Sequence, residues 1–288
     1  MDFSKLFSLE GKVALITGGS RGIGKMLLEG YLAAGCERVY ITARKREQIA
    51  ETVAEFEGAY PGKVIGLPGD LSQMEDVKRL AAELASRESR LDVLVNNAGA
   101  AWGADFDQFP EVGWDKVMDL NVKSLFFLTQ QLHGLLSAAA SFDRPAKVIN
   151  IASIDGLRPN PWETYSYQAS KAAVIHLTKR MAARLIKDNI VVSCIAPGAY
   201  PSEMNKAAAK NPEGSARGIP YKRVGVAEDI AGGAIWGGGG RGGGGGGGGG
   251  GRGGGGGGDG GGGGGAPNEP RGLDTGRGHL LRGGTALA

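Results

Sequence analysis

Ser153, Tyr167 and Lys171 are the side chains whose types and spacing point most clearly to chemistry. Tyr167 and Lys171 stand four positions apart in a stretch with a helical pattern, which places them on one face of a helix. Tyrosine is a poor acid–base catalyst at neutral pH because its reference pKa is about 10, but a nearby ammonium group favours the phenolate and lowers that pKa. A serine hydroxyl can hold and polarise a carbonyl group. We therefore expect proton transfer at a carbonyl or alcohol oxygen, with Lys171 lowering the pKa of Tyr167.

Each of these residues alone is a weak signal, since a tyrosine and a lysine at this spacing are more often a surface pair. Tyr165 is a second tyrosine near Lys171, but it precedes the lysine by six positions and lies on another face of the helix. Tyr167 is therefore the better candidate for the proton donor.

A glycine-rich turn follows residues 12–17, the first stretch with a strand pattern. Glycines let the backbone turn sharply and approach a pyrophosphate, which the free N–H groups at the start of the next helix attract. The glycine spacing differs from the common G-x-G-x-x-G order, and a plain strand-to-helix turn is the competing interpretation. Its place after the first strand of an alternating pattern favours nucleotide binding by Gly18, Ser20, Arg21, Gly22, Ile23 and Gly24.

The end of the second strand pattern indicates which nicotinamide cofactor binds. An NAD-binding domain has an acid here for the ribose 2′-hydroxyl, whereas this chain has three cations, Arg44 to Arg46, before Glu47. A 2′-phosphate is bound well by arginine, and Arg21 in the glycine turn could reach the same phosphate. The alternative is a solvated start to the second helix. The sequence thus favours NADP(H), with Arg44 and Arg21 on the 2′-phosphate.

Short apolar stretches alternate with longer helical patterns. The predicted strands are residues 12–17, 38–42, 63–67, 91–95, 147–152 and 190–196, and they are almost continuously apolar, as strands covered on both faces should be. The predicted helices are residues 22–34, 45–57, 72–87, 113–140 with a break, and 164–188. This alternation predicts an α/β fold with a doubly wound parallel sheet of the Rossmann type, in which ligands bind at the carboxyl ends of the strands.

Glycine content divides the chain into three parts. Of the 29 positions from 237 to 265, 26 are glycine, the others being Arg241, Arg252 and Asp259. Glycine has no side chain to bury and much backbone entropy to lose, so we expect this tract to be disordered. The predicted parts are a nucleotide-binding domain over residues 1–236, the glycine-rich tract 237–265, and a remnant 266–288 with a possible last strand at 275–284.

Composition excludes several classes of function. Net charge is +3, and the tail beyond residue 236 contributes five arginines against three acids, so the folded part is near neutral and we expect no nucleic-acid partner. Two cysteines, Cys36 and Cys194, and three scattered histidines make a metal site improbable, and both thiols are expected to be reduced and buried. With neither a transmembrane stretch nor a signal pattern, we expect a cytoplasmic protein that does not bind a membrane.

Taken together, the motifs resemble the short-chain dehydrogenase/reductase family with a Tyr-x-x-x-Lys active site. The matching residues run in the family's order from residue 11 to 198: Thr17-Gly18-x-x-x-Gly22-x-Gly24, Asp70-Leu71, Asn96-Asn97-Ala98-Gly99, Asn121, Ser153, Tyr167-Gln168-Ala169-Ser170-Lys171 and Pro197-Gly198. Within the family, NNAGAAWG at 96–103 and PGAYPSEM at 197–204 are most similar to the β-ketoacyl reductases of the rhamnolipid-pathway type.

The resemblance implies a role for each matching residue. Tyr167 would donate a proton to a small-molecule ketone, Ser153 would orient its carbonyl, and Lys171 would hold the nicotinamide ribose. Asn121 would keep a water in the proton relay, or alternatively would only kink the long helix. The other expected cofactor contacts are Asp70 and Leu71 at the adenine, Asn97, Ala98 and Gly99 at the adenosine ribose, and Pro197 and Gly198 behind the nicotinamide; the run from Asn96 to Gly99 could also be a simple turn.

The chain departs from the family pattern beyond residue 236. The family ends with a helix and a last parallel strand, and it forms homo-oligomers through contacts near that end. Here Thr275 to Gly284 keeps the spacing of the last strand, but Leu280 and Leu281 are its only large apolar residues. We therefore expect the strand to be lost, the alternative being that it pairs beside residues 190–196 across a flexible loop.

Three functions compete. The first is a ketone reductase, with 3-oxoacyl thioesters as one candidate substrate class. In this interpretation, Leu157, Arg158 and Trp162 either line an acyl pocket or form an ordinary loop. The second is a catalytically impaired nucleotide-binding protein, whose site is disrupted because the last strand is lost. The third is an interaction protein that uses the glycine–arginine tail. The intact Ser153, Tyr167 and Lys171 favour the first.

Overall fold

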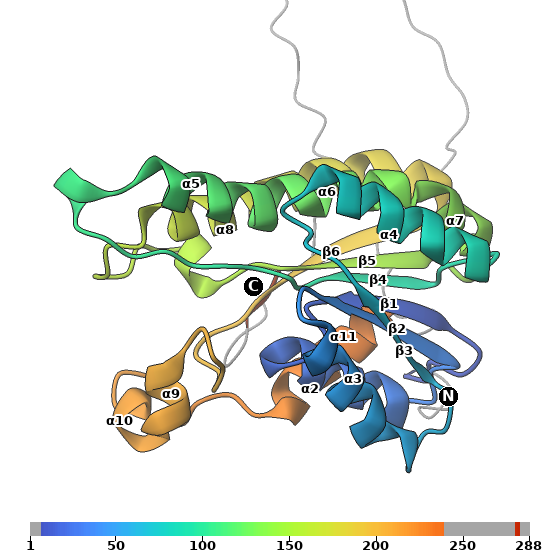
Figure 1. Cartoon of the computed structure of the whole chain (residues 1–288), viewed down its shortest axis with the longest axis horizontal. Helices are drawn as coiled ribbons and strands as arrows, with labels where there is room; N and C mark the ends of the chain where they lie inside the picture. Colours follow the sequence, from blue (N-terminus) through green and yellow to red (C-terminus); the bar gives the residue numbers. More distant parts are fainter. Residues whose placement is uncertain (1–6, 239–279, 283–288) are drawn as a thin grey trace, which may run out of the picture.

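A parallel sheet lies between two layers of helices (Figure 1). The computed structural model describes residues 7–238 and 280–282. Its strands follow the order β3-β2-β1-β4-β5-β6-β7, so the direction of winding reverses between β1 and β4. The strands are β1 (Val13–Thr17), β2 (Arg38–Ala43), β3 (Val64–Pro68), β4 (Val93–Asn96), β5 (Ala146–Ile151), β6 (Ile190–Ala196) and β7 (Leu280–Arg282). The predicted doubly wound sheet is confirmed.

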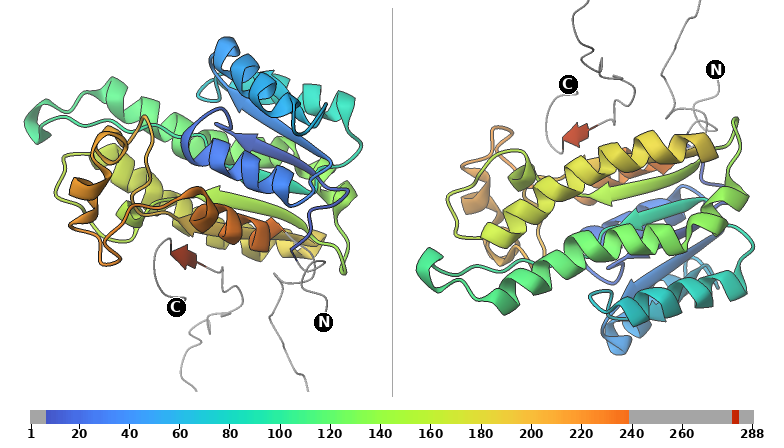
Figure 2. Two further views of the ribbon diagram at one scale, coloured as in Figure 1. Left: turned by 90° about the horizontal axis from the view of Figure 1, so that it is seen from below. Right: turned by 90° about the horizontal axis from the view of Figure 1, so that it is seen from above.

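Helices cover both faces of the sheet, which explains why the strands are apolar on both sides (Figure 2). One face carries α2 (Gly22–Ala33), α3 (Arg46–Glu57) and α11 (Ala227–Gly238). The other face carries α4 (Met74–Arg87), α5 (Glu111–Met118), α6 (Ser124–Gln131), α7 (His133–Ala139) and α8 (Tyr165–Leu185). Each face has its own apolar core, with Val148 and Val174 in one and Ile149 and Leu28 in the other.

The helix predicted at 113–140 is broken, as expected. A π-helical turn, η2 (Asp119–Lys123), separates α5 from α6, and a second interruption at Leu132 separates α6 from α7. Asn121 is buried in this π-helical turn, an irregularity of the kind at which helices bend.

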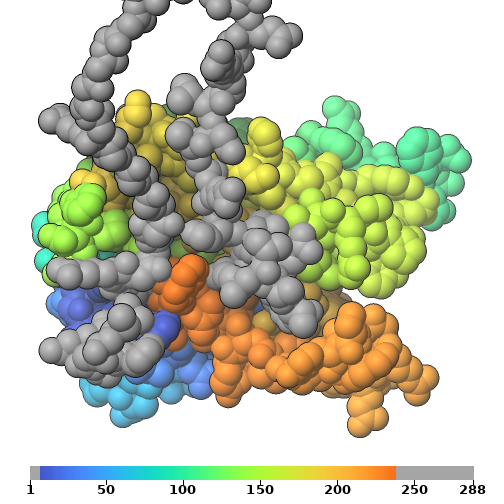
Figure 3. All heavy atoms as spheres, turned by 180° about the vertical axis from the view of Figure 1, so that it is seen from behind, coloured from blue at the N-terminus to red at the C-terminus, as the bar shows by residue number. Residues whose placement is uncertain are grey.

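Short helical segments complete the described part of the chain. These are η1 (Phe106–Gln108), η3 (Ile154–Gly156), η4 (Ile186–Asp188), α9 (Lys206–Lys210) and α10 (Pro212–Ala216). The segment with α9 and α10 follows β6 and stands as a lobe beside the body of the molecule (Figure 3).

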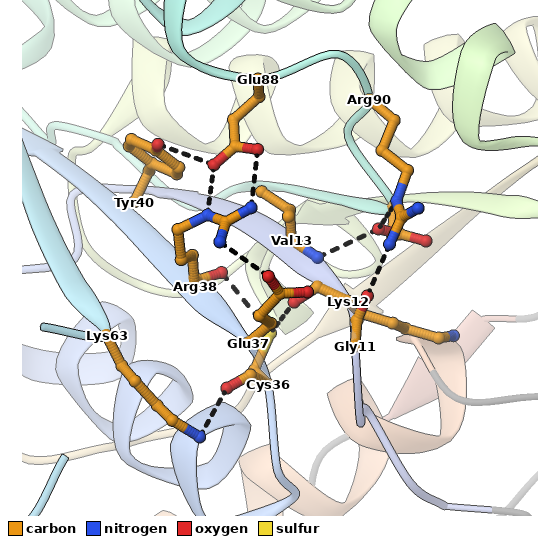
Figure 4. Close-up of polar contacts among 11 residues, drawn as sticks. Gly11, Lys12, Val13, Cys36, Glu37, Arg38, Tyr40, Lys63, Glu88 and Arg90 are labelled. Atoms are coloured by element: carbon orange, nitrogen blue, oxygen red, sulfur yellow. Dashed lines mark hydrogen bonds and ion pairs between the residues drawn. The ribbon is translucent and has the colours of Figure 1, made fainter. Parts of the chain in front are cut away.

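At the amino ends of the strands, charged side chains are bound to one another (Figure 4). The guanidinium of Arg38 donates to both carboxylate oxygens of Glu88, at 2.5 and 3.0 Å, and Tyr40 donates to the same carboxylate at 2.8 Å. Cys36 and Cys194 are free and buried, as predicted, and the thiol of Cys36 donates to the carbonyl oxygen of Lys12. The contacts of Arg38 and Tyr40 thus join β2 to the residue that follows α4.

The last strand corrects the expectation that it is lost. Leu280–Arg282 forms β7, which pairs in parallel with residues 194–196 of β6. The open edge of β6 offers unpaired backbone groups, and the entropy of closing a loop grows only slowly with its length, so a short partner strand is sufficient. The rest of the proposed strand at 275–284 lies outside the described residues.

The helix α11 extends to Gly238, two residues beyond the predicted boundary at 236. A Cβ atom on Gly237 would lie 3.2 Å from Cδ1 of Ile149, so a residue without a side chain suits this close packing against the sheet. The remainder of the glycine-rich tract, residues 239–265, lies outside the described residues.

Candidate active site

One cleft opens at the carboxyl ends of the strands, where the winding direction reverses. All the residues predicted to contact the cofactor line it: Gly18, Ser20, Arg21, Gly22, Ile23, Gly24, Arg44, Asp70, Leu71, Asn97, Ala98, Gly99, Tyr167, Lys171, Pro197 and Gly198. Ser153 also lines it. Residues from six strand ends therefore meet in one place.

The glycine turn after β1 has a shape that favours glycine at three positions. Gly18 and Gly22 have φ angles of 67° and 51°, in the left-handed region. A Cβ atom on Gly24 would collide with the carbonyl oxygen of Gly18, because the first turn of α2 packs directly against the loop. The turn therefore leads tightly into the start of α2, and the N-terminus of a helix suits an anion such as a pyrophosphate.

The loop after β4 braces this glycine turn. Asn97 donates through Nδ2 to the carbonyl oxygen of Thr17 at 2.8 Å. The backbone N–H groups of Asn97 and Ala98 both donate to Oγ1 of Thr17, each at 2.9 Å. Asn97 therefore positions the glycine turn, whether or not it also contacts a ribose.

The loop after β3 places Asp70 in the cleft. One carboxylate oxygen of Asp70 accepts hydrogen bonds from the backbone N–H and the hydroxyl of Ser72, at 3.1 and 2.8 Å. The backbone N–H of Asp70 donates to Asp76, which Arg79 also binds. Asp70 is thus fixed where the resemblance places adenine.

The two arginines expected at the 2′-phosphate have different surroundings. Arg44 lines the cleft together with Lys45 and Gln48. Arg21 also lines it, but its guanidinium forms an ion pair with Glu203, in the segment between β6 and α9. The acidic partner of Arg21 was not foreseen, because it is remote in the sequence.

Ser153, Tyr167 and Lys171 lie close together at the carboxyl end of β5. Ser153 follows the strand, and its hydroxyl accepts from the backbone N–H of Asp155 at 3.1 Å and forms a hydrogen bond with Tyr167. Lys171 donates to the carbonyl oxygen of Ile151 at 2.8 Å, and its Nζ lies 5.7 Å from the centre of the Tyr167 ring. The three side chains predicted to act together are adjacent.

Tyr165 has a different environment. Its hydroxyl donates to Glu163 at 2.9 Å, and its ring packs edge-on against Phe106 and Phe109. Unlike Tyr167, it is absent from the described lining of the cleft. The preference for Tyr167 as the candidate side chain agrees with this geometry.

The expected fall in the pKa of Tyr167 is wrong for the protein alone. Burial raises the pKa of Tyr167, the hydrogen bond from Ser153 lowers it, and the charge of Asp155 raises it, with a net upward shift. Burial also lowers the pKa of Lys171 to about 8, because the ammonium is removed from water. Lys171 thus lies beside the ring, but the groups that shift the pKa of Tyr167 are its buried surroundings, Ser153 and Asp155.

Asn121 lies beneath the cleft and does not line it. Its side-chain oxygen accepts from the backbone N–H of Ala100 at 2.8 Å, and its Nδ2 donates to the carbonyl oxygen of Ala100 and to Ser170 at 3.0 and 2.9 Å. Ser170 in turn donates to the carbonyl oxygen of Tyr167 at 2.7 Å. The Asn121 side chain therefore ties the loop after β4 to the helix that carries Tyr167.

Sequence reasoning missed some residues of the cleft. Thr42, Lys116, Leu120, Ile151, Ser202 and Met204 line it without having been assigned to it, although Ser202 and Met204 belong to the quoted stretch 197–204. Leu157, Arg158 and Trp162, which were suggested either for an acyl pocket or for an ordinary loop, are not among the residues that line this cleft. Trp162 is 68% exposed, and Leu157 packs against the core.

Within the described ranges, no helix is long and apolar enough to cross a membrane. The same ranges contain no group of three or more histidine, cysteine or acidic side chains placed to bind a metal ion.

Characterised proteins similar to this chain share its motifs over most of their length. The rhamnolipids biosynthesis 3-oxoacyl-[acyl-carrier-protein] reductase of Pseudomonas aeruginosa is 45% identical over 232 residues, covering 80% of this chain and 90% of that protein. The 3-oxoacyl-[acyl-carrier-protein] reductase FabG of Thermotoga maritima is 35% identical over 224 residues, covering 77% and 88%. A 2-dehydro-3-deoxy-D-gluconate 5-dehydrogenase of Dickeya dadantii is 34% identical over 241 residues, covering 80% and 89%.

The fold has close counterparts among solved structures. The RhlG/NADP active-site complex of Pseudomonas aeruginosa superposes with a TM-score of 0.79 at 44% identity, covering 83% of this chain and 93% of that one. The sequence pattern of the short chain dehydrogenases matches residues 12–213, which include the glycine turn, Ser153, Tyr167 and Lys171. The chain belongs to the short-chain dehydrogenase family.

Proposed function

We propose that this chain reduces a ketone to a secondary alcohol with NADPH, using Ser153, Tyr167 and Lys171 as its active-site side chains. The observation that carries the proposal is the adjacency of these three residues in the same cleft as the glycine turn. The chain is an oxidoreductase that acts on the CH–OH group of its substrate and uses NADP(H) as cofactor.

The cleft offers a binding group for each part of the cofactor. The glycine turn would hold the pyrophosphate at the start of α2, and Asp70, Leu71 and residues 97–99 would surround the adenosine. Arg44, with Lys45 beside it, would bind the 2′-phosphate. Lys171 would bind the nicotinamide ribose, and Pro197 and Gly198 would lie behind the nicotinamide. When bound, NADPH supplies the hydride.

The protein side chains would supply the proton that the carbonyl oxygen takes up. Tyr167 would donate its hydroxyl proton to the carbonyl oxygen, and Ser153 would hold that oxygen in place. Because burial raises the pKa of Tyr167, the phenol stays protonated before the reaction, which suits a proton donor. Asn121 would act as a positioning residue that fixes α8 through Ser170. Because both polar atoms of its side chain already have partners, a water of the proton relay would bind to the backbone of Asn121.

The ketone is proposed to be a 3-oxoacyl thioester. The support is the name of the relative that is 45% identical, and the relative that acts on a sugar acid is less similar, at 34%. NADPH absorbance in a panel of 3-oxoacyl thioesters and keto sugar acids tests this directly. Turnover of the thioesters supports the proposal, and turnover of keto acids alone contradicts the substrate class. NADPH binding without turnover of any ketone would favour an impaired nucleotide-binding protein.

Homo-oligomeric assembly and a cytoplasmic location remain predictions. The first is carried by family resemblance, and the tail beyond residue 238, where family contacts are expected, lies outside the described residues. Light scattering of the purified chain at two concentrations would test assembly.

A further inference from the structure

An ion pair joins the two sides of the cofactor cleft. Arg21 belongs to the glycine turn after β1, and Glu203 belongs to the segment after β6, although β4 and β5 lie between those strands in the sheet. The two segments are in close contact, since a Cβ atom on Gly22 would lie 3.3 Å from Cβ of Ser202. Both charged side chains remain accessible, being 48% and 61% exposed, and both line the cleft.

Arg21 lines the same cleft as Arg44 and Lys45. The carbonyl oxygen of its neighbour Ser20 accepts a hydrogen bond from Thr52 of α3 at 3.1 Å, which fixes the glycine turn against that helix. Thr52 also donates to the carbonyl oxygen of Gln48, and Gln48 lines the cleft with Arg44. The glycine turn that carries Arg21 is therefore attached to α3, the helix that follows Arg44.

Glu203 and a phosphate of the cofactor would compete for one guanidinium group. An arginine binds carboxylates and phosphates alike, and Glu203 already pairs with one nitrogen of Arg21, so this acid neutralises part of the charge that a phosphate would meet there. A phosphate monoester carries more negative charge than a carboxylate, and an exposed ion pair is weak, so the phosphate is the stronger partner. A 2′-phosphate on Arg21 would nevertheless meet the like charge of Glu203.

We propose that Glu203 competes with the cofactor's 2′-phosphate for Arg21 and thereby reduces the preference of this cleft for NADPH over NADH. The inference rests on the proposed function and adds a residue that tunes it. Glu203 is a positioning residue, because it acts through Arg21. It is predicted to have little influence on NADH, which has a hydroxyl group where NADPH has the phosphate.

Cofactor titrations with matched variants test the competition. Dissociation constants for NADPH and NADH are measured by nicotinamide fluorescence for the full chain and for Glu203→Gln, which removes the charge and keeps the shape. Glu203→Asp keeps the charge, and Glu213→Gln removes an exposed acid of α10 that does not line the cleft. The same Glu203→Gln change is then made in an Arg21→Met background.

The proposal expects Glu203→Gln to tighten NADPH binding about two- to fivefold and to leave NADH unchanged. Glu203→Asp and Glu213→Gln should behave like the unmodified chain, and Glu203→Gln should have no effect once Arg21 is methionine. Equal changes for both cofactors would show a merely structural role and overturn the proposal, as would weaker NADPH binding or an effect that survives Arg21→Met. A chain that binds neither cofactor contradicts the proposed function as well, whereas a chain that prefers NADPH but is indifferent to Glu203→Gln contradicts only the competition.

Discussion

Lys147 and Lys171 lie at opposite ends of β5 and are both buried, with 1% and 5% exposure. Burial lowers the pKa of each to about 8. Lys171 donates to the carbonyl oxygen of Ile151 beside Tyr167, whereas Nζ of Lys147 has no hydrogen-bond partner among the described residues. A lowered pKa therefore does not identify a functional lysine in this molecule; its position at the carboxyl ends of the strands does.

The largest effect on activity is expected from a substitution at the carboxyl end of β5. Tyr167→Phe removes the proposed proton donor and should lower kcat about 10²- to 10⁴-fold, while NADPH binding is retained. Steady-state rates and cofactor titrations measure the two effects separately. Tyr165→Phe is the matched control, and a loss of turnover in the control but not in Tyr167→Phe would reverse the assignment.

The next effect concerns the cofactor in the same cleft. Arg44→Asp replaces the cation proposed to bind the 2′-phosphate by an anion, which repels the phosphate. It should weaken NADPH binding about 10- to 100-fold with little change for NADH. Titration with both cofactors measures this difference. If the unmodified chain already prefers NADH, the interpretation of this cation cluster is wrong.

Replacing Lys147, at the amino end of β5, is expected to stabilise the protein, whereas the two substitutions above impair turnover or cofactor binding. Lys147→Met removes a buried ammonium without a partner and should raise the free energy of unfolding by about 1–3 kcal/mol at pH 7, with kcat unchanged. The unfolded chain holds this proton up to about pH 10.5, while the folded chain releases it near pH 8. Stability of the unmodified protein should therefore rise between these values, and the advantage of the variant should shrink there.

Denaturant unfolding at several pH values measures this effect. Lys179→Met on the exposed face of α8 is the control and should change stability by less than about 0.5 kcal/mol. Destabilisation by Lys147→Met would show that this lysine has a stabilising partner.

The smallest effect concerns the surroundings of Tyr167. Asp155→Asn removes a charge that raises the pKa of Tyr167 and should move the corresponding limb of the pH–rate profile to lower pH. The backbone N–H of residue 155, which donates to Ser153, is kept. A profile that stays in place, or that moves equally in the exposed-residue control Asp115→Asn, would contradict this influence.

Much of the fold follows from local patterns. Each of the six strands from β1 to β6 overlaps its predicted range, because a strand covered on both faces is apolar throughout and is bounded by turns. Gly18, Gly22 and Gly24 were predicted to form a tight turn after the first strand, and the structure shows that positive φ or close packing favours glycine at each position. The spacing of Tyr167 and Lys171 was enough to place both on one face of a helix.

Other features depend on residues remote in the sequence. The partner of Arg21 comes from beyond β6, the π-helical turn seats Asn121 against Ala100 and Ser170, and β7 pairs with an edge that no local pattern describes. Ser202 reaches the cleft only because the segment after β6 folds back over the glycine turn.

Residue types and their spacing were therefore sufficient to locate the strands and the glycine turn and to select three side chains that the structure brings together, because backbone geometry is periodic and local. Only the tertiary structure decided which charges meet across the cleft and in which direction the pKa of Tyr167 moves. Ion pairing and desolvation depend on distance and burial in space, and the order of residues along a chain specifies neither.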